Sequence, residues 1–241
     1  MFEERMSLLE NAQACRSTGT GMAAVNAALL SSVKAGDRLV ASKALFGSCD
    51  YICRELLPKF GIETTMVNGT DLAEWEAALD KPTAVVFMET PSNPQLDIID
   101  LERVSSLAHK VGARVIVDNV LATPILQRPL DFGVDVVVYS STKHIDGQGR
   151  AMGGCILTND VDWSEGDLKQ FMRHTGPSLS PFNAWVHLKS LETLEIRVRH
   201  HCQSAQKVDE FLESQKIIKK VLFPGLKRHP QYGLAQTQMN G

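Results

Sequence analysis

Apolar runs alternate with helix-like segments along the first two thirds of the chain. Six runs rich in valine and isoleucine have the length of strands, and several are almost continuously apolar, which is typical of strands buried on both faces. They are Leu39–Ser42, Ile62–Val67, Ala84–Met88, Arg114–Asp118, Val134–Ser140 and Gly154–Leu157. Helical patterns lie between them, over Gly21–Val33, Ser48–Lys59, Leu72–Leu79 and Leu101–Val111. This alternation predicts an α/β fold with a mostly parallel sheet flanked by helices.

The pattern changes after about residue 165, where helical segments follow one another without strands between them. Asp167–His174 has a helical pattern, and Pro181–Gln215 is long enough for two helices or one bent helix. Ile217–Phe223 is predicted to form a further strand, because it is apolar and precedes a Pro-Gly turn. Near the N-terminus, Phe2–Asn11 and Glu10–Arg16 both have a helical pattern.

Composition and charge exclude several classes of protein. The chain has 241 residues, of which 44% are hydrophobic and 22% are charged, so it is expected to fold around a core. The net charge of −3 gives no basic excess for nucleic-acid binding, and no apolar run approaches the ~18 residues of a membrane-spanning helix. The N-terminus lacks a signal-peptide pattern, and the five cysteines form no CxxC pair. We therefore expect a cytoplasmic protein without nucleic-acid or membrane partners.

The segment with the strongest chemical pattern is Val137–His144. An apolar strand ends there in three hydroxyl residues and a lysine, and ligands of doubly wound sheets bind beyond the carboxyl ends of the strands. The hydroxyls of Ser140 and Thr142 are placed to bind one phosphate. Lys143 beside them has the placement needed for a Schiff base with a phosphate-bearing aldehyde. The simpler alternative is a strand-end lysine that is only solvated.

Three further strand ends carry candidate residues. Asp118 ends the strand Arg114–Asp118 and can pair with a protonated pyridine nitrogen, or else cap a turn. Asn93 lies in a proline-rich loop and can donate to a phenolate oxygen, or else only form the turn. Phe46 follows the strand Leu39–Ser42 and can stack on a planar cofactor, or else pack in the core.

A glycine-containing segment opens the helix that starts at Gly21. Thr20, Gly21 and Met22 place backbone N–H groups at a helix N-terminus, where a phosphate is favoured. The spacing Gly19-x-Gly21-x-x-Ala24 also matches a dinucleotide fingerprint. That alternative is disfavoured because Glu10–Arg16 looks helical, whereas the fingerprint follows a strand.

Two other clusters indicate chemistry less strongly. Cys49 and Cys53 are four residues apart on a predicted helix, but no pair of histidines lies near them in the sequence, so no metal site is expected. His200–Cys202 lies on a charged helix and is interpreted as part of a solvated face.

Together these signals indicate one cofactor site, and the intervals Asn93–Asp118 and Asp118–Lys143 are both 25 residues (118 − 93 and 143 − 118). The chain resembles the cystathionine/methionine-metabolism family of pyridoxal-phosphate enzymes of fold type I. The matching stretches are GTGMAA, LFGSC, ETPSNP, VDNVLATPILQ, STKHIDGQGRAMGG and FPGLKRHPQ.

The resemblance implies pyridoxal 5′-phosphate as the cofactor and assigns the site residues. Lys143 resembles the Schiff-base lysine, and Asp118 resembles the partner of the pyridine nitrogen. The remaining implied cofactor-binding residues are Thr20, Gly21 and Met22 at the phosphate, Ser140 and Thr142 as its hydroxyl ligands, Asn93 at the phenolate, and Phe46 on the ring. Lys143 and Asp118 are the implied catalytic residues.

The resemblance also implies an architecture and a reaction. We expect an aspartate-aminotransferase-like large domain over residues 1–190, with a linking helix and the start of a smaller domain over 191–241. Phe46, where many relatives carry tyrosine, and the run Asp146–Arg150 resemble the O-succinylhomoserine sulfhydrylase branch, which replaces succinate with sulfide to give homocysteine in methionine biosynthesis. The alternatives are a cystathionine γ-synthase or γ-lyase type of reaction, or an inactive cofactor-binding fragment.

The resemblance also implies how the subunits assemble and which segments of the family lie outside this chain. Members form homo-oligomers, as a dimer of dimers, in which a Tyr-x-Arg stretch of one subunit binds the phosphate of its neighbour. That stretch precedes the position of Met1, and the arginine that holds the substrate carboxylate follows the position of Gly241. We therefore expect an internal fragment that lacks both ends.

Overall fold

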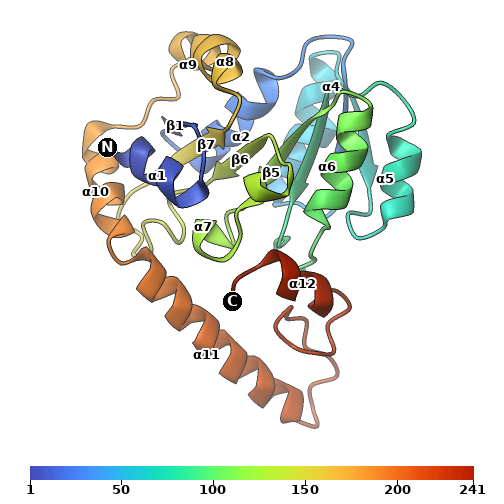
Figure 1. Cartoon of the computed structure of the whole chain (residues 1–241), viewed down its shortest axis with the longest axis vertical. Helices are drawn as coiled ribbons and strands as arrows, with labels where there is room; N and C mark the ends of the chain where they lie inside the picture. Colours follow the sequence, from blue (N-terminus) through green and yellow to red (C-terminus); the bar gives the residue numbers. More distant parts are fainter.

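Seven strands form a single mixed sheet in the order β1-β7-β6-β5-β4-β2-β3 (Figure 1). The computed structural model describes residues 1–241. Five strands run parallel, β7 is antiparallel to β6, and β1 is antiparallel to β7. The strands are β1 (Ala14–Thr18), β2 (Arg38–Ser42), β3 (Glu63–Val67), β4 (Val85–Glu89), β5 (Arg114–Asp118), β6 (Val136–Tyr139) and β7 (Gly154–Thr158). The predicted α/β class and the mostly parallel sheet are confirmed.

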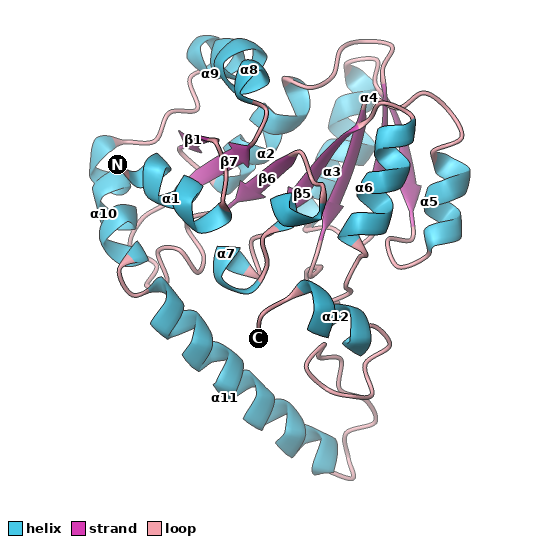
Figure 2. Cartoon of the chain, viewed as in Figure 1, coloured by secondary structure: helices cyan, strands magenta, loops and turns pink.

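Helices cover both faces of this sheet, as Figure 2 shows. They are α1 (Phe2–Glu10), α2 (Gly21–Leu30), α3 (Gly47–Tyr51), α4 (Leu57–Lys59), α5 (Leu72–Ala78), α6 (Leu101–Lys110), α7 (Thr123–Leu126), α8 (Val161–Trp163), α9 (Lys169–Thr175), α10 (Pro181–Leu191), α11 (Leu194–Ser214) and α12 (Tyr232–Gln238). A π-helical turn over Ile52–Leu56 joins α3 to α4, and a second over Ser164–Leu168 joins α8 to α9. A 3₁₀ turn covers Pro129–Phe132.

The sheet separates two hydrophobic clusters. Along β5, Val115 and Val117 belong to one cluster and Ile116 to the other, because successive side chains of a strand point to opposite faces. The first cluster includes side chains of α1, α5 and α6, and the second includes side chains of α2, α3 and α4. Burial on both faces accounts for the nearly continuous apolar strands.

The segment before α2 is a strand, so the helical interpretation of Glu10–Arg16 is wrong. The helix α1 ends at Glu10, and Asn11 adopts a left-handed conformation with φ 60°. Residues Ala14–Thr18 then pair with β7 as an edge strand. A strand therefore does precede Gly19-x-Gly21-x-x-Ala24. However, it is antiparallel to its neighbour, and β2 lies five places away in the sheet, so no parallel βαβ unit of the dinucleotide type is formed.

The strand expected over Ile217–Phe223 is also not formed. These residues are irregular, and Ile217 is 88% exposed. A strand requires a neighbouring edge for its backbone hydrogen bonds, and this segment pairs with none of the seven strands of the sheet. Its apolar pattern alone therefore does not produce β-structure.

The C-terminal elements return to the body of the protein. The long pattern Pro181–Gln215 forms two helices, α10 and α11, and α11 extends away from the sheet in Figure 1. Gln238 at the end of α12 accepts from Leu101 N at 3.0 Å and donates to Ile99 O at 3.0 Å. The division into domains at residue 190 stays a prediction. None of the helices combines the length and apolar character needed to cross a membrane.

Candidate functional site

A cavity of about 640 Å³ opens at the carboxyl ends of the parallel strands, next to the start of α2. All nine residues predicted for the site line it, although they come from five separate parts of the sequence. They are Thr20, Gly21, Met22, Phe46, Asn93, Asp118, Ser140, Thr142 and Lys143. The structure thus brings the whole predicted set together, and the role of each member stays a prediction.

Gly21 is the point of closest approach between α2 and the end of β6. A Cβ atom at Gly21 would lie 2.4 Å from Cβ of Ser140, so only glycine fits here. Thr20 is the N-cap of α2, and its hydroxyl accepts from Ala23 N at 3.0 Å. The N–H groups at the start of α2 therefore face the Ser140 segment, where an anion is favoured by the helix dipole.

Ser140 and Thr142, the two predicted hydroxyl ligands, differ in the hydrogen bonds that their side chains make. The Thr142 hydroxyl donates to Gly153 O at 3.2 Å and accepts from Gly153 N at 3.1 Å. Ser140 makes no such side-chain hydrogen bond. Ser140 is therefore free to donate to a phosphate, whereas Thr142 also holds the loop before β7 in place.

Asp118 forms the buried acidic floor of the cavity together with Glu89. The two residues are register partners on the adjacent strands β5 and β4. Burial raises the pKa of Asp118 to about 6, although Val120 N donates to its Oδ1 at 3.0 Å. Burial and the charge of Asp118 raise the pKa of Glu89 to about 8. Burial and the proximity of the two groups therefore disfavour two negative charges on this pair.

Glu89 was not among the predicted site residues. Its Oε2 accepts from Phe46 N at 2.5 Å, and its Oε1 accepts from Asn93 N at 2.9 Å. The Glu89 carboxyl group thus connects the segment of Phe46, predicted to stack on the ring, with the segment of Asn93, predicted to bind the phenolate. The signal that could have found it is a second carboxylate at a strand end, within the same stretch as Asn93.

Lys143 lies in a turn just after β6 and projects into the cavity. The turn is closed by hydrogen bonds from Lys143 N to Ser140 O at 3.1 Å and from Gly147 N to Lys143 O at 2.7 Å. The Lys143 side chain is exposed, and its amine forms no salt bridge within the chain. The amine is therefore available to react with a ligand.

Among the other lining residues that were not predicted for the site, three have titratable side chains. Tyr139 lies at the end of β6, His144 follows Lys143, and His201 comes from α11. The His144 and His201 rings are 5.9 Å apart, and burial lowers the pKa of His144. His201 is exposed, as expected for a solvated face, but this face is also a wall of the cavity.

The groups of this cavity fit pyridoxal phosphate. The close approach at Gly21 leaves an anion cradle between α2 and Ser140. The carboxyl of Asp118 lies at the floor, and the free amine of Lys143 enters from the adjacent strand end. The volume is within the range of about 300–1,000 Å³ that small-molecule sites occupy. The three chemical needs of the cofactor, a phosphate site, a partner for the ring nitrogen and an amine, are met.

Comparison with known proteins gives a consistent result. The profile of the family described as Cys/Met metabolism PLP-dependent enzyme matches residues 1–241. The chain is 54% identical over 241 residues to an O-succinylhomoserine sulfhydrylase of Mycobacterium tuberculosis, covering 100% of the chain and 59% of that relative. It is 40% identical to an L-methionine gamma-lyase of Treponema denticola, covering 99% of the chain and 60% of that relative.

The fold is shared with solved structures as well. A cystathionine gamma synthase from Xanthomonas oryzae pv. oryzae, in complex with aminoacrylate and cysteine, superposes with a TM-score of 0.97 at 35% identity. The match covers 100% of this chain and 62% of that chain. The chain thus spans about three fifths of the length of the relatives it matches.

Proposed function

The chain belongs to the family of Cys/Met metabolism PLP-dependent enzymes, and on that premise we propose that it carries out a γ-replacement on an activated homoserine. Sulfide would displace succinate from O-succinylhomoserine to give homocysteine. The observation that carries this proposal is the convergence of nine predicted residues on one cavity. The similarity to an O-succinylhomoserine sulfhydrylase at 54% identity supports replacement over elimination, because the similarity to an L-methionine gamma-lyase is 40%.

Pyridoxal phosphate is the cofactor of this family, and bound at the site it supplies an aldehyde and an electron-accepting ring. The N–H groups of Gly21 and Met22 would bind its phosphate together with Ser140 and, once released from Gly153, Thr142. Asp118 would accept a hydrogen bond from the protonated ring nitrogen, which keeps the ring electron-poor. The remaining holding groups are Asn93 at the phenolate oxygen and Phe46 against the ring.

Lys143 is the group proposed to move protons. With its amine free at the strand end, Lys143 would take the proton from Cα of the substrate and exchange protons at Cβ. In the net reaction the bond between Cγ and the succinate oxygen would break, succinate would leave, and sulfide would form the new bond to Cγ, which gives homocysteine. Phe46 brings no phenol to this step, so we assign the proton transfer to Lys143, which lines the same cavity.

The test is a product assay on the purified chain with O-succinylhomoserine, in the presence and absence of sulfide, with Lys143→Ala as the control. Homocysteine formed only with sulfide would support the proposal. Formation of 2-oxobutyrate and ammonia without sulfide would instead identify an eliminating enzyme. A chain that traps the cofactor but forms neither product would correspond to the alternative of a binding fragment.

Location and assembly belong to the same proposal. All five cysteines are free and four of them are buried, which fits the reducing environment of the cytoplasm. We also propose a homo-oligomer as in the family, and the exposed Phe182 and Trp185 on α10, 70% and 57% exposed, offer apolar surface for such contacts. Light scattering after size-exclusion chromatography tests this, and a monomer would refute it.

A further inference from the structure

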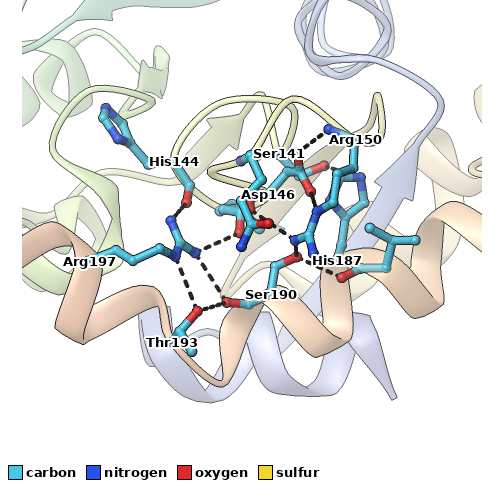
Figure 3. Close-up of polar contacts among 11 residues, drawn as sticks. Ser141, His144, Asp146, Arg150, His187, Ser190, Thr193 and Arg197 are labelled. Atoms are coloured by element: carbon cyan, nitrogen blue, oxygen red, sulfur yellow. Dashed lines mark hydrogen bonds and ion pairs between the residues drawn. The ribbon is translucent and has the colours of Figure 1, made fainter.

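The turn that carries Lys143 is fixed to a distant part of the chain by one arginine side chain. Arg197 on α11 donates from Nη1 to His144 O at 2.7 Å and from Nη2 to Ile145 O at 3.2 Å (Figure 3). These are the two carbonyls that follow Lys143. Since Gly147 N already binds Lys143 O at 2.7 Å, three successive carbonyls of the turn are all bonded.

The same guanidinium is held in place from the opposite side. Its Nη2 also donates to Ser190 O at 3.1 Å, and its Nε donates to Thr193 Oγ1 at 3.1 Å. Both partners lie at the junction of α10 and α11. A planar guanidinium can make this set of bonds at once, whereas a lysine ammonium at the end of a flexible chain cannot bridge both sides.

Gly147 gives independent support for the fit between the turn and this arginine. It has φ +69°, and a Cβ atom built on it would lie 1.9 Å from Nη1 of Arg197. The left-handed glycine therefore leaves the space that the guanidinium fills. A side chain at this position would displace Arg197.

A buried carboxylate completes the arrangement. Asp146 is fully buried and accepts from Arg150 N at 2.7 Å and from Arg150 Nε at 3.1 Å. Arg150 Nη2 donates in turn to Ser190 Oγ at 2.6 Å. The segment after Lys143 is thus bonded twice to the α10–α11 junction, through Arg197 and through Arg150 (Figure 3).

We propose that Arg197 is a positioning residue, which sets the direction of Lys143 by binding the carbonyls of the turn that carries it. Arg197 does not line the cavity, so it acts through the turn that carries Lys143 and not by touching a ligand. The inference rests on the proposed attachment of the cofactor at Lys143. It adds that the reactivity of this amine depends on a side chain 54 positions later in the sequence (197 − 143).

The experiment separates reaction at Lys143 from binding in the cavity. Arg197→Lys is compared with the wild type and with Arg199→Lys, a matched control on the same helix. One arm measures the rate of borohydride trapping of pyridoxal phosphate on Lys143. The other measures the affinity for pyridoxine 5′-phosphate, which has the phosphate and ring but no aldehyde. We expect trapping to slow about tenfold or more, because small misplacement of a reacting group is costly, with affinity for the analogue within about twofold.

A third readout needs no cofactor. Hydrogen exchange of the Gly147 amide, which donates to Lys143 O, is expected to be faster in Arg197→Lys and unchanged in Arg199→Lys. Gly147→Ala is the second variant, and it is expected to reproduce both the slower trapping and the preserved affinity for the analogue.

The outcomes distinguish the inference from the proposed function. Trapping at the wild-type rate in Arg197→Lys would overturn the inference alone. Parallel loss of trapping and of analogue affinity would also overturn it, because Arg197 would then support the fold in general. If Lys143 of the wild type is not labelled, the proposed function fails. In that case the hydrogen exchange still tests the inference, because an unchanged exchange rate of the Gly147 amide in Arg197→Lys would refute the claim that Arg197 fixes the turn.

Discussion

Glu89 and Asp118 are register partners at the ends of two adjacent parallel strands, so two buried carboxyl groups lie next to each other on one side of the cavity. Because Glu89 also accepts two backbone N–H groups, it connects both predicted ring-contacting segments to this floor. Burial raises the pKa values of both groups, to about 8 for Glu89 and about 6 for Asp118. Two negative charges on this pair are therefore disfavoured, and a positively charged group bound beside Asp118 would stabilise its charged form.

Asp118→Asn is expected to preserve the fold and to weaken the hold on the ring proton. The amide oxygen can still accept from Val120 N, but the charge is lost. A neighbouring opposite charge is worth about 1–3 pKa units, so we expect activity to fall on the order of 10- to 1,000-fold. The measurement is a pH titration of the absorbance of the bound cofactor, with the exposed Asp80→Asn as control. An unchanged titration in Asp118→Asn would exclude the assigned role.

Gly21→Ala is expected to open the anion cradle. The added methyl would overlap Cβ of Ser140, so the start of α2 must move away from the end of β6. Overpacking of this kind costs about 1–3 kcal/mol of folding free energy, and we expect the affinity for pyridoxine phosphate to fall by at least about tenfold. Gly166→Ala is the matched control, because nothing lies within 4 Å of a Cβ atom there. Equal affinity in the two variants would show that the close approach does not shape the phosphate site.

Ser140 and Thr142 are expected to behave differently, because only one of them has a free hydroxyl. Ser140→Ala removes one hydrogen bond to a charged group, which is worth about 1.5–3 kcal/mol, and should mainly lower phosphate affinity. Thr142→Val leaves Gly153 N without its partner, and Gly153 O keeps only the Thr142 N–H, so the substitution should mainly lower the melting temperature. Calorimetric titration with pyridoxine phosphate and thermal unfolding check this. The reverse pattern would contradict the assignment.

The sequence pattern was sufficient to predict the central strands of the sheet. Strands buried on both faces, such as Arg114–Asp118, are almost continuously apolar and are therefore easy to recognise. The pattern failed at Ala14–Thr18 because this edge strand is mostly polar, so its pairing with β7 is a tertiary effect. It failed at Ile217–Phe223 for the opposite reason, since the segment is apolar but no strand lies beside it.

The residues of the candidate site that follow strands could be predicted from the sequence. The residues that hold them in place could not. Lys143, Asp118 and Asn93 each follow an apolar run, so their place at one sheet edge follows from parallel topology. Arg197 carries no such signal, because its contacts with His144 and Ile145 depend on how α11 crosses the turn. The occupation of the Thr142 hydroxyl by Gly153 is likewise visible only in three dimensions.

Glu10 is expected to make the stability of the cofactor-free chain depend on pH. It is fully buried, accepts from the Tyr139 phenol, and has one carboxyl oxygen without a partner. Burial raises its pKa from 4.5 to about 8. The folded chain therefore binds more protons than the unfolded chain between these values, and stability is present at low pH and lost as pH rises from about 5 to 8.

The measurement is the change in melting temperature between pH 5 and pH 8, in the wild type and in Glu10→Gln. Glutamine keeps the shape without the titrating proton, so the fall in melting temperature should be smaller. Part of the fall should remain, because Glu89 titrates in the same window. The exposed Glu76→Gln is the control and should behave as the wild type. An equally steep fall in Glu10→Gln would show that Glu10 does not titrate in this way.

Lys143 is the amine proposed to hold the cofactor, and every proposed step depends on it. The direct measurement is borohydride reduction of the chain loaded with pyridoxal phosphate, followed by proteolysis and mass spectrometry of the modified peptide. The account predicts a single phosphopyridoxyl group on Lys143, and no such group in Lys143→Ala. Stoichiometric labelling of another lysine, or labelling that persists in Lys143→Ala, would contradict it.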